Sequence, residues 1–208
     1  MRTYVYIDGF NLYYGATKGT PYRWLNLGKF CQFMLPTHNI IRINYYTARV
    51  AAQPRDPSQP VRQQTYLRAL ATIPNLSIVY GHFLSHEVNA PLAAPCAGGP
   101  ATARVIRTEE KGSDVNLATH LLWHAFRNDY DIAVVVSNDS DLLEPIRIAK
   151  AELGKRIVVI NPHKNKPSRQ LLQVADEFKR IKTTTLAACQ FPPQLTDSHG
   201  TFTKPALW

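Results

Sequence analysis

The hydrophobic and polar positions of this 208-residue chain follow two periods, one typical of strands and one typical of helices. Short runs rich in β-branched and aromatic residues predict strands, and apolar positions three and four residues apart predict helices. The predicted strands are Tyr4–Asp8, Ile40–Val50, Leu76–Phe83, a short Val105–Ile106, Ile132–Ser137 and Arg156–Ile160. The predicted helices are Leu27–Leu35, Val61–Ile73, Val115–Phe126, Ser140–Leu153 and Ser168–Asp176. Because strands and helices alternate, we expect a three-layer α/β domain with a mostly parallel sheet and helices on both faces.

Two segments interrupt this alternation. Residues 53–60 contain three prolines and predict a loop, whose last proline can occupy the first turn of the next helix. Residues 88–103 carry no charge and are rich in Ala, Pro and Gly, which predicts an extended or disordered loop that either contacts substrate or only connects elements. Towards the end of the chain the regular period is lost. We therefore predict one domain over residues 1–182 and an irregular C-terminal tail over residues 183–208.

The charge balance narrows the classes of partner. There are 24 Lys and Arg against 15 Asp and Glu, a formal net charge of +9, which suits a polyanion such as nucleic acid or an anionic membrane surface. No run of about 18 apolar residues is present, so the sequence predicts no membrane span. Of the two kinds of polyanion we expect nucleic acid, and no membrane partner. Cys31, Cys96 and Cys189 form no C-x-x-C pair, which favours neither a disulfide framework nor a zinc knuckle. This cysteine usage predicts a cytoplasmic protein.

Four aspartates stand where the chain leaves a predicted strand or enters a predicted helix. Asp8 ends the first strand, Asp139 and Asp141 follow the strand at residues 132–137, and Asp114 opens a helix. Taken alone, each is explained as a turn residue, a helix cap or a first-turn acid. Taken together they suggest one acidic site, because loops beyond the carboxyl ends of parallel strands meet in one crevice. Carboxylates held close together repel each other, and a hard divalent cation is the usual compensation.

Three short motifs, in this order, resemble the signatures of bacterial NYN domains, a branch of the PIN-like nucleases. They are Ile7-Asp8-Gly9-Phe10-Asn11-Leu12, Glu110-Lys111-Gly112-Ser113-Asp114-Val115 and Val136-Ser137-Asn138-Asp139-Ser140-Asp141-Leu142. The similarity runs from about Thr3 to about Ile181, and the strands and helices between the motifs match as well. One departure is Asn138, where many members of the family have Gly. Because Asn tolerates unusual φ values, we do not expect this residue to remove activity.

The resemblance implies a PIN-type sheet and hydrolysis of RNA phosphodiester bonds by a metal-activated water at an aspartate cluster. The implied cofactor is Mg²⁺ or Mn²⁺, bound as one ion or as two. The implied catalytic and metal-binding residues are Asp8, Asp114, Asp139 and Asp141. Asn11 is implied as a further catalytic residue that orients Asp8 or the phosphate. The implied partner is RNA, single-stranded or structured. A second copy of the chain, forming a homodimer, is a possible further partner.

Basic and aromatic residues near these motifs are candidates for RNA contacts. Lys111 follows two glutamates and either contacts phosphate or belongs to a solvated charge cluster. A basic group lies before and at the start of the last predicted helix, where backbone N–H groups also favour phosphate. Its members are Lys164, Lys166 and Arg169. Four aromatic residues close to the first motif either stack on bases or belong to the core. They are Tyr13, Tyr14, Tyr22 and Trp24.

Three alternative interpretations have less support in the sequence. His120 and His124 stand four residues apart on a predicted helix, but the Glu that follows the first His in metalloprotease helices is absent, so zinc is poorly supported. An aspartate-based phosphatase needs a second acid two residues after the first, and this position is Phe10. A PIN-like module that binds or regulates RNA without cleaving it is the main alternative. Loss of cleavage usually shows as a missing acid, and all four are present.

Overall fold

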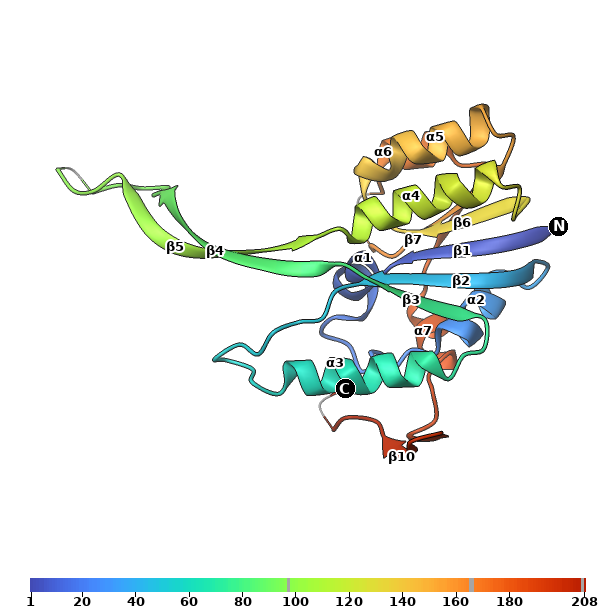
Figure 1. The fold of residues 1–208 in the computed structure, drawn as a ribbon, viewed down its shortest axis with the longest axis horizontal. Coiled ribbons are helices and arrows are strands. Elements are labelled where there is room, and N and C mark those ends of the chain that lie inside the picture. Colours follow the sequence, from blue (N-terminus) through green and yellow to red (C-terminus); the bar gives the residue numbers. More distant parts are fainter. Residues whose placement is uncertain (97, 165–166, 207) are drawn as a thin grey trace.

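A six-stranded parallel sheet forms the centre of the computed structural model, which describes residues 1–96, 98–164, 167–206 and 208 (Figure 1). In sheet order the strands are β3 (Leu76–Tyr80), β2 (Asn39–Thr47), β1 (Arg2–Asp8), β6 (Ile132–Val136), β7 (Arg156–Asn161) and β8 (Glu177–Arg180). Every neighbouring pair in this sheet is parallel. The predicted α/β fold class is confirmed, and β8 is a strand that the sequence pattern does not predict.

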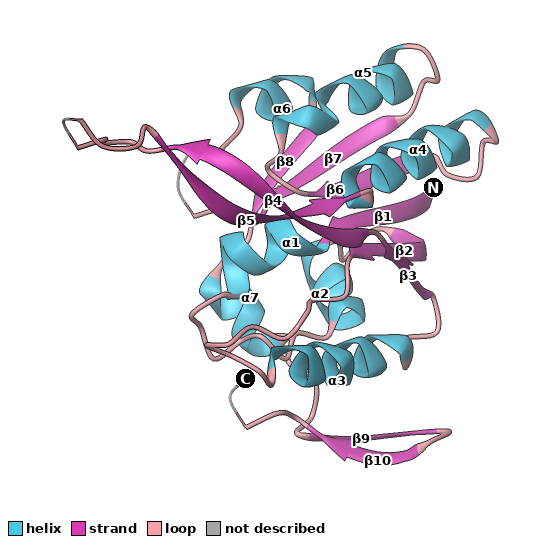
Figure 2. Cartoon of the chain, turned by 60° about the vertical axis from the view of Figure 1, so that its left-hand side comes forward, coloured by secondary structure: helices cyan, strands magenta, loops and turns pink. Residues whose placement is uncertain are grey.

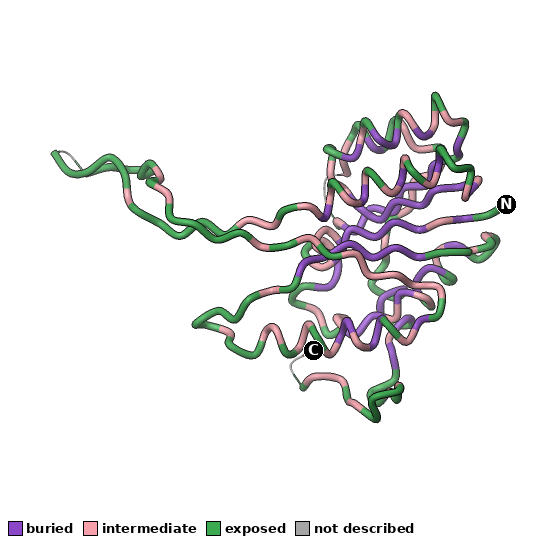
Figure 3. The backbone as a smooth tube through the Cα atoms, viewed as in Figure 1, coloured by how far each residue is buried: buried purple, intermediate pink, exposed green. Residues whose placement is uncertain are grey.

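Helices cover both faces of the sheet. Successive residues of a strand point to opposite faces, and both sets are apolar here, so each face needs a layer of helices to bury it. In β1, Val5 and Ile7 belong to one hydrophobic core, and Tyr6 belongs to the other. The first core is closed by α2 (Leu27–Met34), α3 (Gln59–Ala71) and α7 (Thr183–Ala188). The second core is closed by α4 (Ser113–Phe126), α5 (Leu143–Ala151) and α6 (Arg169–Val174). Figure 3 shows the buried residues gathered along the sheet and the inner sides of the helices. In the described ranges no helix is long and apolar enough to cross a membrane.

The strand order reverses between β1 and β6, in the middle of the sheet. From β1 the chain builds outward through β2 and β3, and it later places β6, β7 and β8 on the other side. Loops after β1 and β6 therefore lead away in opposite directions and leave a crevice at the carboxyl ends of these strands. After β1 come α1 (Gly9–Leu12) and a π-helical turn, η1 (Tyr13–Thr17). After β6 comes a 3₁₀ turn, η2 (Ser140–Leu142). The fold thus brings the first and third motifs together.

A long two-stranded hairpin projects from the body of the molecule (Figures 1 and 2). It consists of β4 (His82–Pro91) and β5 (Thr102–Lys111), paired antiparallel over their whole length. The prediction of a loop over residues 88–103 is therefore wrong at both of its ends. A third strand that reaches Phe83 and a strand limited to Val105–Ile106 are also wrong. Most residues on both faces of the ribbon are exposed, so the sequence lacks the alternation of apolar and polar residues that marks a half-buried strand.

Replacing residues 90–102 at the tip of the hairpin by a short Gly/Ser linker is expected to leave the free energy of unfolding nearly unchanged. Leu92 and Cys96 are exposed there, and loop-closure entropy changes slowly with loop length. Chemical denaturation of the two proteins checks this, and a large loss of stability would show that the tip packs against the domain. If the tip guides substrate, the same variant will also bind RNA more weakly while its metal requirement stays intact. Unchanged RNA kinetics would mark it as a simple connection.

The C-terminal segment contains regular structure, contrary to the prediction of an irregular tail. After α7 it forms a second hairpin from β9 (Gln194–Asp197) and β10 (Gly200–Thr203). Arg68 of α3 holds this hairpin through two hydrogen bonds to the Asp197 carboxylate, at 2.6 and 2.7 Å. The strands are short and half of their residues or more are exposed, so they leave no apolar period in the sequence. The domain boundary itself stays a prediction.

Candidate active site

The switch point between β1 and β6 opens into a crevice of about 370 Å³, called here the acidic crevice. Four parts of the chain contribute to it: the β1–α1 turn, the base of the long hairpin with the start of α4, the loop after β6 and the loop after β7. Its lining residues are Asp8, Phe10, Asn11, Tyr14, Phe83, Glu110, Ser113, Asp114, Asp139 and His163. Three of the four predicted aspartates and Asn11 are therefore brought together, and Asp141 is not part of the lining.

Asp8 is buried at the carboxyl end of β1, and both of its carboxylate oxygens accept hydrogen bonds. Oδ1 accepts from the backbone N–H of Asn11 at 2.9 Å, which caps α1, and Oδ2 accepts from the Ser137 hydroxyl at 3.0 Å. Burial raises the pKa of Asp8 above its usual value, although these hydrogen bonds act in the opposite direction. Asp8 is thus a helix cap and, at the same time, a fixed carboxylate that faces the crevice.

The corner between β5 and α4 brings two more acids into the crevice. Gly112 has a φ of 96°, a conformation that favours glycine, and it turns the chain from strand to helix. Glu110 closes the corner by accepting hydrogen bonds from the backbone N–H of Ser113 at 3.1 Å and from its hydroxyl at 2.6 Å. Asp114 lies in the first turn of α4. Its pKa is raised to about 6, first by burial and then by the neighbouring carboxylates, Asp8 foremost.

The loop after β6 carries Asp139 and Asp141, and the structure separates their positions. Asp139 lines the crevice, and its Oδ1 accepts a hydrogen bond at 3.0 Å from the backbone N–H of Asp141, which caps η2. Asp141 is exposed, although its charge contributes to the raised pKa of Asp114. Asp139 therefore acts as a cap and faces the crevice, whereas Asp141 stands outside the lining.

Asn11 ties three loops of the crevice together. Its Oδ1 accepts a hydrogen bond from the backbone N–H of Asn138 at 3.0 Å and lies 3.1 Å from Nε2 of His163. Because an amide oxygen can only accept, Nε2 of His163 is the donor in this contact. Asn138, through its own Oδ1, accepts from the backbone N–H of Ser168 at 2.7 Å. The residue that departs from the family pattern thus links the loop after β6 to the start of α6. In the described ranges Asn128, and not Asn138, is the non-glycine residue with positive φ.

Among the lining residues that the sequence-based site prediction does not include are His163 and Glu110. The backbone N–H of His163 donates to Oδ1 of Asn161 at 2.8 Å, and its ring packs on Gly15, where a Cβ would lie 2.7 Å from Cδ2. The signal that could identify His163 is its position, a polar residue just beyond the carboxyl end of a buried strand near the switch point. Glu110 lies within the second motif, but its part in closing the β5–α4 corner has no pattern in the sequence.

The predicted RNA-binding cations that the structure describes, Lys111, Lys164 and Arg169, lie outside the lining of the acidic crevice. Lys111 is exposed and pairs with Glu109 at 2.8 Å, as the solvated-cluster interpretation expects. Lys164 is exposed in the loop after β7, and Arg169 is exposed at the start of α6. Lys166 lies outside the described residues. Lys164 and Arg169 are therefore the described cations of this group that stand exposed between the end of β7 and the start of α6.

The aromatic residues near the first motif divide between core and surface. Trp24 is fully buried, and Tyr22 packs against the first core. Tyr14 is 59% exposed and lines the acidic crevice. Tyr13 lines a neighbouring cavity. Two of the four therefore stand where a base can stack on them.

His120 and His124 serve the second core. Nδ1 of His124 lies 2.9 Å from the Tyr6 hydroxyl, and Nδ1 of His120 lies 3.2 Å from the Tyr46 hydroxyl. Burial lowers the pKa of His124 to about 4 and also lowers that of His120, and each ring shares a hydrogen bond with a tyrosine hydroxyl. The pair satisfies two buried hydroxyl groups, which explains its spacing without a zinc ion.

The chemistry of the acidic crevice fits a hard divalent cation. Asp8, Glu110, Asp114 and Asp139 offer carboxylate oxygens, the ligands that Mg²⁺ and Mn²⁺ prefer. The raised pKa of Asp114 reflects their mutual repulsion as well as burial. Among the residues that the structure describes, no three His, Cys, Asp or Glu side chains are close enough to form a metal-binding group. A bound cation would therefore have to draw these carboxylates together.

Comparison with known proteins identifies a family that this chain matches. The family model of the NYN domain matches residues 2–182. The 6-hydroxy-3-succinoylpyridine 3-monooxygenase HspA of Pseudomonas putida (strain DSM 28022 / S16) is 32% identical over 237 residues, covering 100% of this chain and 75% of that protein. The crystal structure of VPA0982, a protein of unknown function from Vibrio parahaemolyticus RIMD 2210633, matches 88% of this chain and 93% of its own. With 18% identity and a TM-score of 0.55, this likeness shows the fold alone.

Proposed function

Because the chain belongs to the NYN domain family of the PIN-like nuclease superfamily, we propose that it is a metal-dependent ribonuclease that hydrolyses RNA phosphodiester bonds at the acidic crevice. The observation that carries the proposal is that four carboxylates, from three separate segments, line one crevice at the switch point of the sheet. Such a cluster destabilises the folded chain unless a cation compensates it. Perturbed acids in a cleft are typical of functional sites.

In this proposal Asp8, Asp114 and Asp139 hold Mg²⁺ or Mn²⁺, and Glu110 is a fourth acid of the same crevice. When bound, such an ion activates a water molecule and neutralises charge that develops on the scissile phosphate. Asn11 acts as a positioning residue, because its amide oxygen fixes the loops after β6 and β7 against the β1–α1 turn. Its hydrogen bonds thereby fix the turn after Asp8 against the loop that carries Asp139.

The basic surface supports RNA as the substrate. The chain carries a net charge of +9 although four acids gather in one crevice, so the remaining surface is more basic still. Cations that meet phosphates supply affinity for any sequence, and they set the strand over the catalytic groups. We place this activity in the cytoplasm, because Cys31, Cys96 and Cys189 are free thiols.

Replacing Lys164, Lys166 and Arg169 together by Ala is expected to weaken RNA binding for all sequences alike. RNA binding releases counterions at each phosphate that a cation contacts. With three contacts removed, fewer counterions are released, so the log–log slope of affinity against salt should flatten by up to roughly three units. Fluorescence anisotropy with labelled RNA at several KCl concentrations measures this slope.

A matched control removes three cations at the other end of the sheet, where the parallel strands begin. Arg2 begins β1, Arg156 begins β7, and Arg127 is the C-cap of α4, so each lies at the end of its element that is remote from the crevice. The triple Ala variant of these arginines should keep the wild-type slope. If the first variant also keeps the wild-type slope, the RNA-binding face lies elsewhere on the molecule.

A second candidate function follows from the relative at 32% identity, whose name describes a monooxygenase of 6-hydroxy-3-succinoylpyridine. The observation in its favour is that this likeness covers the whole chain. The side chains that could bind a metal favour hydrolysis over oxygenation, because the crevice is lined by four carboxylates and one histidine. Iron oxygenase sites of the facial-triad type use two histidines and one carboxylate. The sequence also contains no G-x-G-x-x-G fingerprint for a dinucleotide.

Incubation of the purified protein with single-stranded and with structured RNA, with and without Mg²⁺ or Mn²⁺, tests the proposal. We expect cleavage that requires the metal and stops with a chelator. RNA binding without cleavage in either metal would leave a non-catalytic RNA-binding module. Release of inorganic phosphate from monoesters would point to an aspartate-based phosphatase. Oxygen uptake with 6-hydroxy-3-succinoylpyridine and a two-electron reductant, without RNA cleavage, would favour the second candidate.

A further inference from the structure

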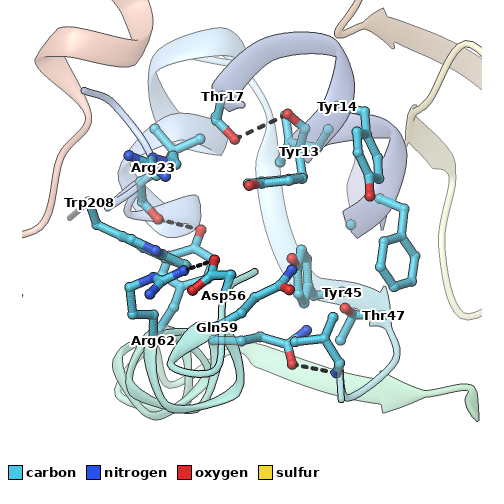
Figure 4. A pocket seen from close by; sticks show the side chains of 17 residues that line it. Tyr13, Tyr14, Thr17, Arg23, Tyr45, Thr47, Asp56, Gln59, Arg62 and Trp208 are labelled. Atoms are coloured by element: carbon cyan, nitrogen blue, oxygen red, sulfur yellow. Dashed lines mark hydrogen bonds and ion pairs between the residues drawn. The ribbon is translucent and has the colours of Figure 1, made fainter. Parts of the chain in front are cut away.

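A second cavity, of about 140 Å³, lies beside the acidic crevice and shares Phe10 and Tyr14 with it. We call it the ring pocket, and its residues in the argument are Tyr13, Tyr45, Gln59, Arg62, Tyr66 and Trp208. Figure 4 shows Tyr13 on one side of the opening and Gln59 and Arg62 on the other, with Trp208 at one end and Tyr45 at the other. The ring pocket and the acidic crevice are therefore neighbours, separated by the side chains of Phe10 and Tyr14.

The inner part of the ring pocket presents flat aromatic faces. Tyr45 and Tyr66 are 7% and 8% exposed, so they form a floor rather than a surface patch. The Tyr66 hydroxyl donates to the carbonyl oxygen of Leu25 at 2.8 Å, and Trp208 packs against the Tyr66 ring with centroids 5.2 Å apart. The Tyr66 hydroxyl therefore already has its hydrogen-bond partner, and the aromatic ring is the part of Tyr66 that remains for a ligand in the pocket to contact. Such walls suit a planar ring that stacks.

The opposite side of the pocket offers polar groups that the fold does not use. Both Nη atoms of Arg62 are engaged, one by the Asp56 carboxylate and the other by the Ser58 hydroxyl at 2.5 Å. Its Nε is buried without a hydrogen-bond partner. The side-chain amide of Gln59 makes no hydrogen bond to any residue that the structure describes. An N–H donor and an amide beside flat walls match the carbonyl oxygens and ring nitrogens at the edge of a heterocycle.

Gly9 joins the ring pocket to the acidic crevice. A Cβ at this position would lie 2.7 Å from Cζ of Tyr45 and 2.6 Å from the carbonyl oxygen of Tyr46. The absence of a side chain therefore lets the Tyr45 ring pack directly against the turn that follows Asp8. Tyr45 lies on β2 and Asp8 ends the neighbouring strand β1, so a ligand ring on Tyr45 and a phosphate near Asp8 would lie on either side of Gly9.

We propose that the ring pocket binds one unpaired nucleobase of the RNA strand whose backbone lies in the acidic crevice, close to the cleaved phosphate. This inference rests on the proposed ribonuclease function and adds a substrate class to it, RNA with an unpaired base at the cleavage site. The volume suits one ring system, and a base inside a duplex remains paired and stacked and does not reach the pocket. The enzyme should therefore prefer single-stranded segments.

The experiment removes one base at a time from a short single-stranded RNA by placing an abasic nucleotide at successive positions. Affinity is measured by fluorescence anisotropy in EDTA, so that no cleavage intervenes, and the cut site is mapped separately with Mn²⁺. At one position near the cut, loss of the base should weaken binding about tenfold. In Gln59→Trp, whose indole fills the pocket, the same loss should have no further effect. Gln64→Trp, an exposed position on the same helix, should behave like the wild type.

Each outcome separates this inference from the proposed function. If the wild type cleaves RNA but the abasic effect is equal at all positions or persists in Gln59→Trp, the ring pocket does not bind a base and the ribonuclease proposal stands. If the position effect is present but neither metal supports cleavage, base binding stands and the ribonuclease proposal fails. If Gln59→Trp does not fold, Tyr13→Ala, which removes one wall, should reduce the position effect instead. A 2-aminopurine riboside that binds the pocket and is not displaced by single-stranded RNA would assign the pocket to a free heterocycle and overturn the inference.

Discussion

Asp139→Asn is expected to lower the rate of metal-dependent RNA cleavage by roughly 100-fold or more, whereas Asp141→Asn should lower it by less than about tenfold. Asp139 lines the acidic crevice beside Asp8 and Asp114, and Asp141 is exposed outside it. The Asn side chain still offers an oxygen to the backbone N–H of residue 141, so the cap of η2 survives in the first variant. Single-turnover cleavage of a labelled RNA in Mn²⁺ measures both rates.

Asp8→Asn should remove activity as well, but it is the less clean variant. Both oxygens of Asp8 accept hydrogen bonds, from the Asn11 backbone and from the Ser137 hydroxyl, and an amide can present only one oxygen to these donors. We therefore expect Asp8→Asn to lose stability along with activity, and its thermal midpoint must be measured beside the rate. His124→Ala is the negative control, because this ring contacts the second core and not the crevice. Full activity in Asp139→Asn and Asp8→Asn would exclude the acidic crevice as the active site.

The parts of the fold that the sequence predicts well are those buried on both faces. The strand at residues 132–136 is fully buried and entirely apolar, so its pattern can mean little else. β8 (Glu177–Arg180) has three charged residues in four and lies at the edge of the sheet, where burial does not select apolar side chains. The long hairpin is missed for a related reason. Its pairing is set by backbone hydrogen bonds between two exposed strands, and residues 88–91 supply neither charge nor an apolar period.

The residues of the acidic crevice likewise divide into those that the sequence predicts and those that it does not. Asp8, Asp114 and Asp139 are predictable because each follows a buried strand or opens a helix near the switch point, and parallel strands bring such positions together. Asp141 shares a motif with Asp139, yet residues two apart in a helical turn do not face the same side, so one of the two is turned away. His163 has no motif around it. Its place in the crevice depends on the contact of its ring with Gly15 and on its bond to Asn11, which are visible only in three dimensions.

Asp114→Asn is expected to raise the thermal midpoint in EDTA at pH 8 by a few degrees and to leave it unchanged near pH 4. The pKa of Asp114 is raised to about 6 by burial and by the neighbouring carboxylates, against an ordinary value of 3.8. Above pH 6 the folded chain therefore carries the full unfavourable charge. As the pH falls from 6 to 3.8 the folded state takes up the proton first, and this cost disappears. Because Asp114 is half-exposed, solvent screens part of the effect, and about 1 kcal/mol is a reasonable size, equivalent to roughly 2–4 °C.

Differential scanning fluorimetry across this pH range measures the effect, with two comparisons to identify its cause. Asp131→Asn should show the opposite sign at pH 8, because hydrogen bonds with Arg2 lower the pKa of Asp131 to about 2 and its charge stabilises the fold. Addition of Mn²⁺ should raise the midpoint of the wild type more than that of Asp114→Asn, since a cation that binds the folded crevice stabilises it by mass action. A midpoint of Asp114→Asn that is lower than wild type at pH 8, or an equal response of both proteins to Mn²⁺, would mean that Asp114 is held by a structural partner and is not part of a repelling, metal-binding cluster.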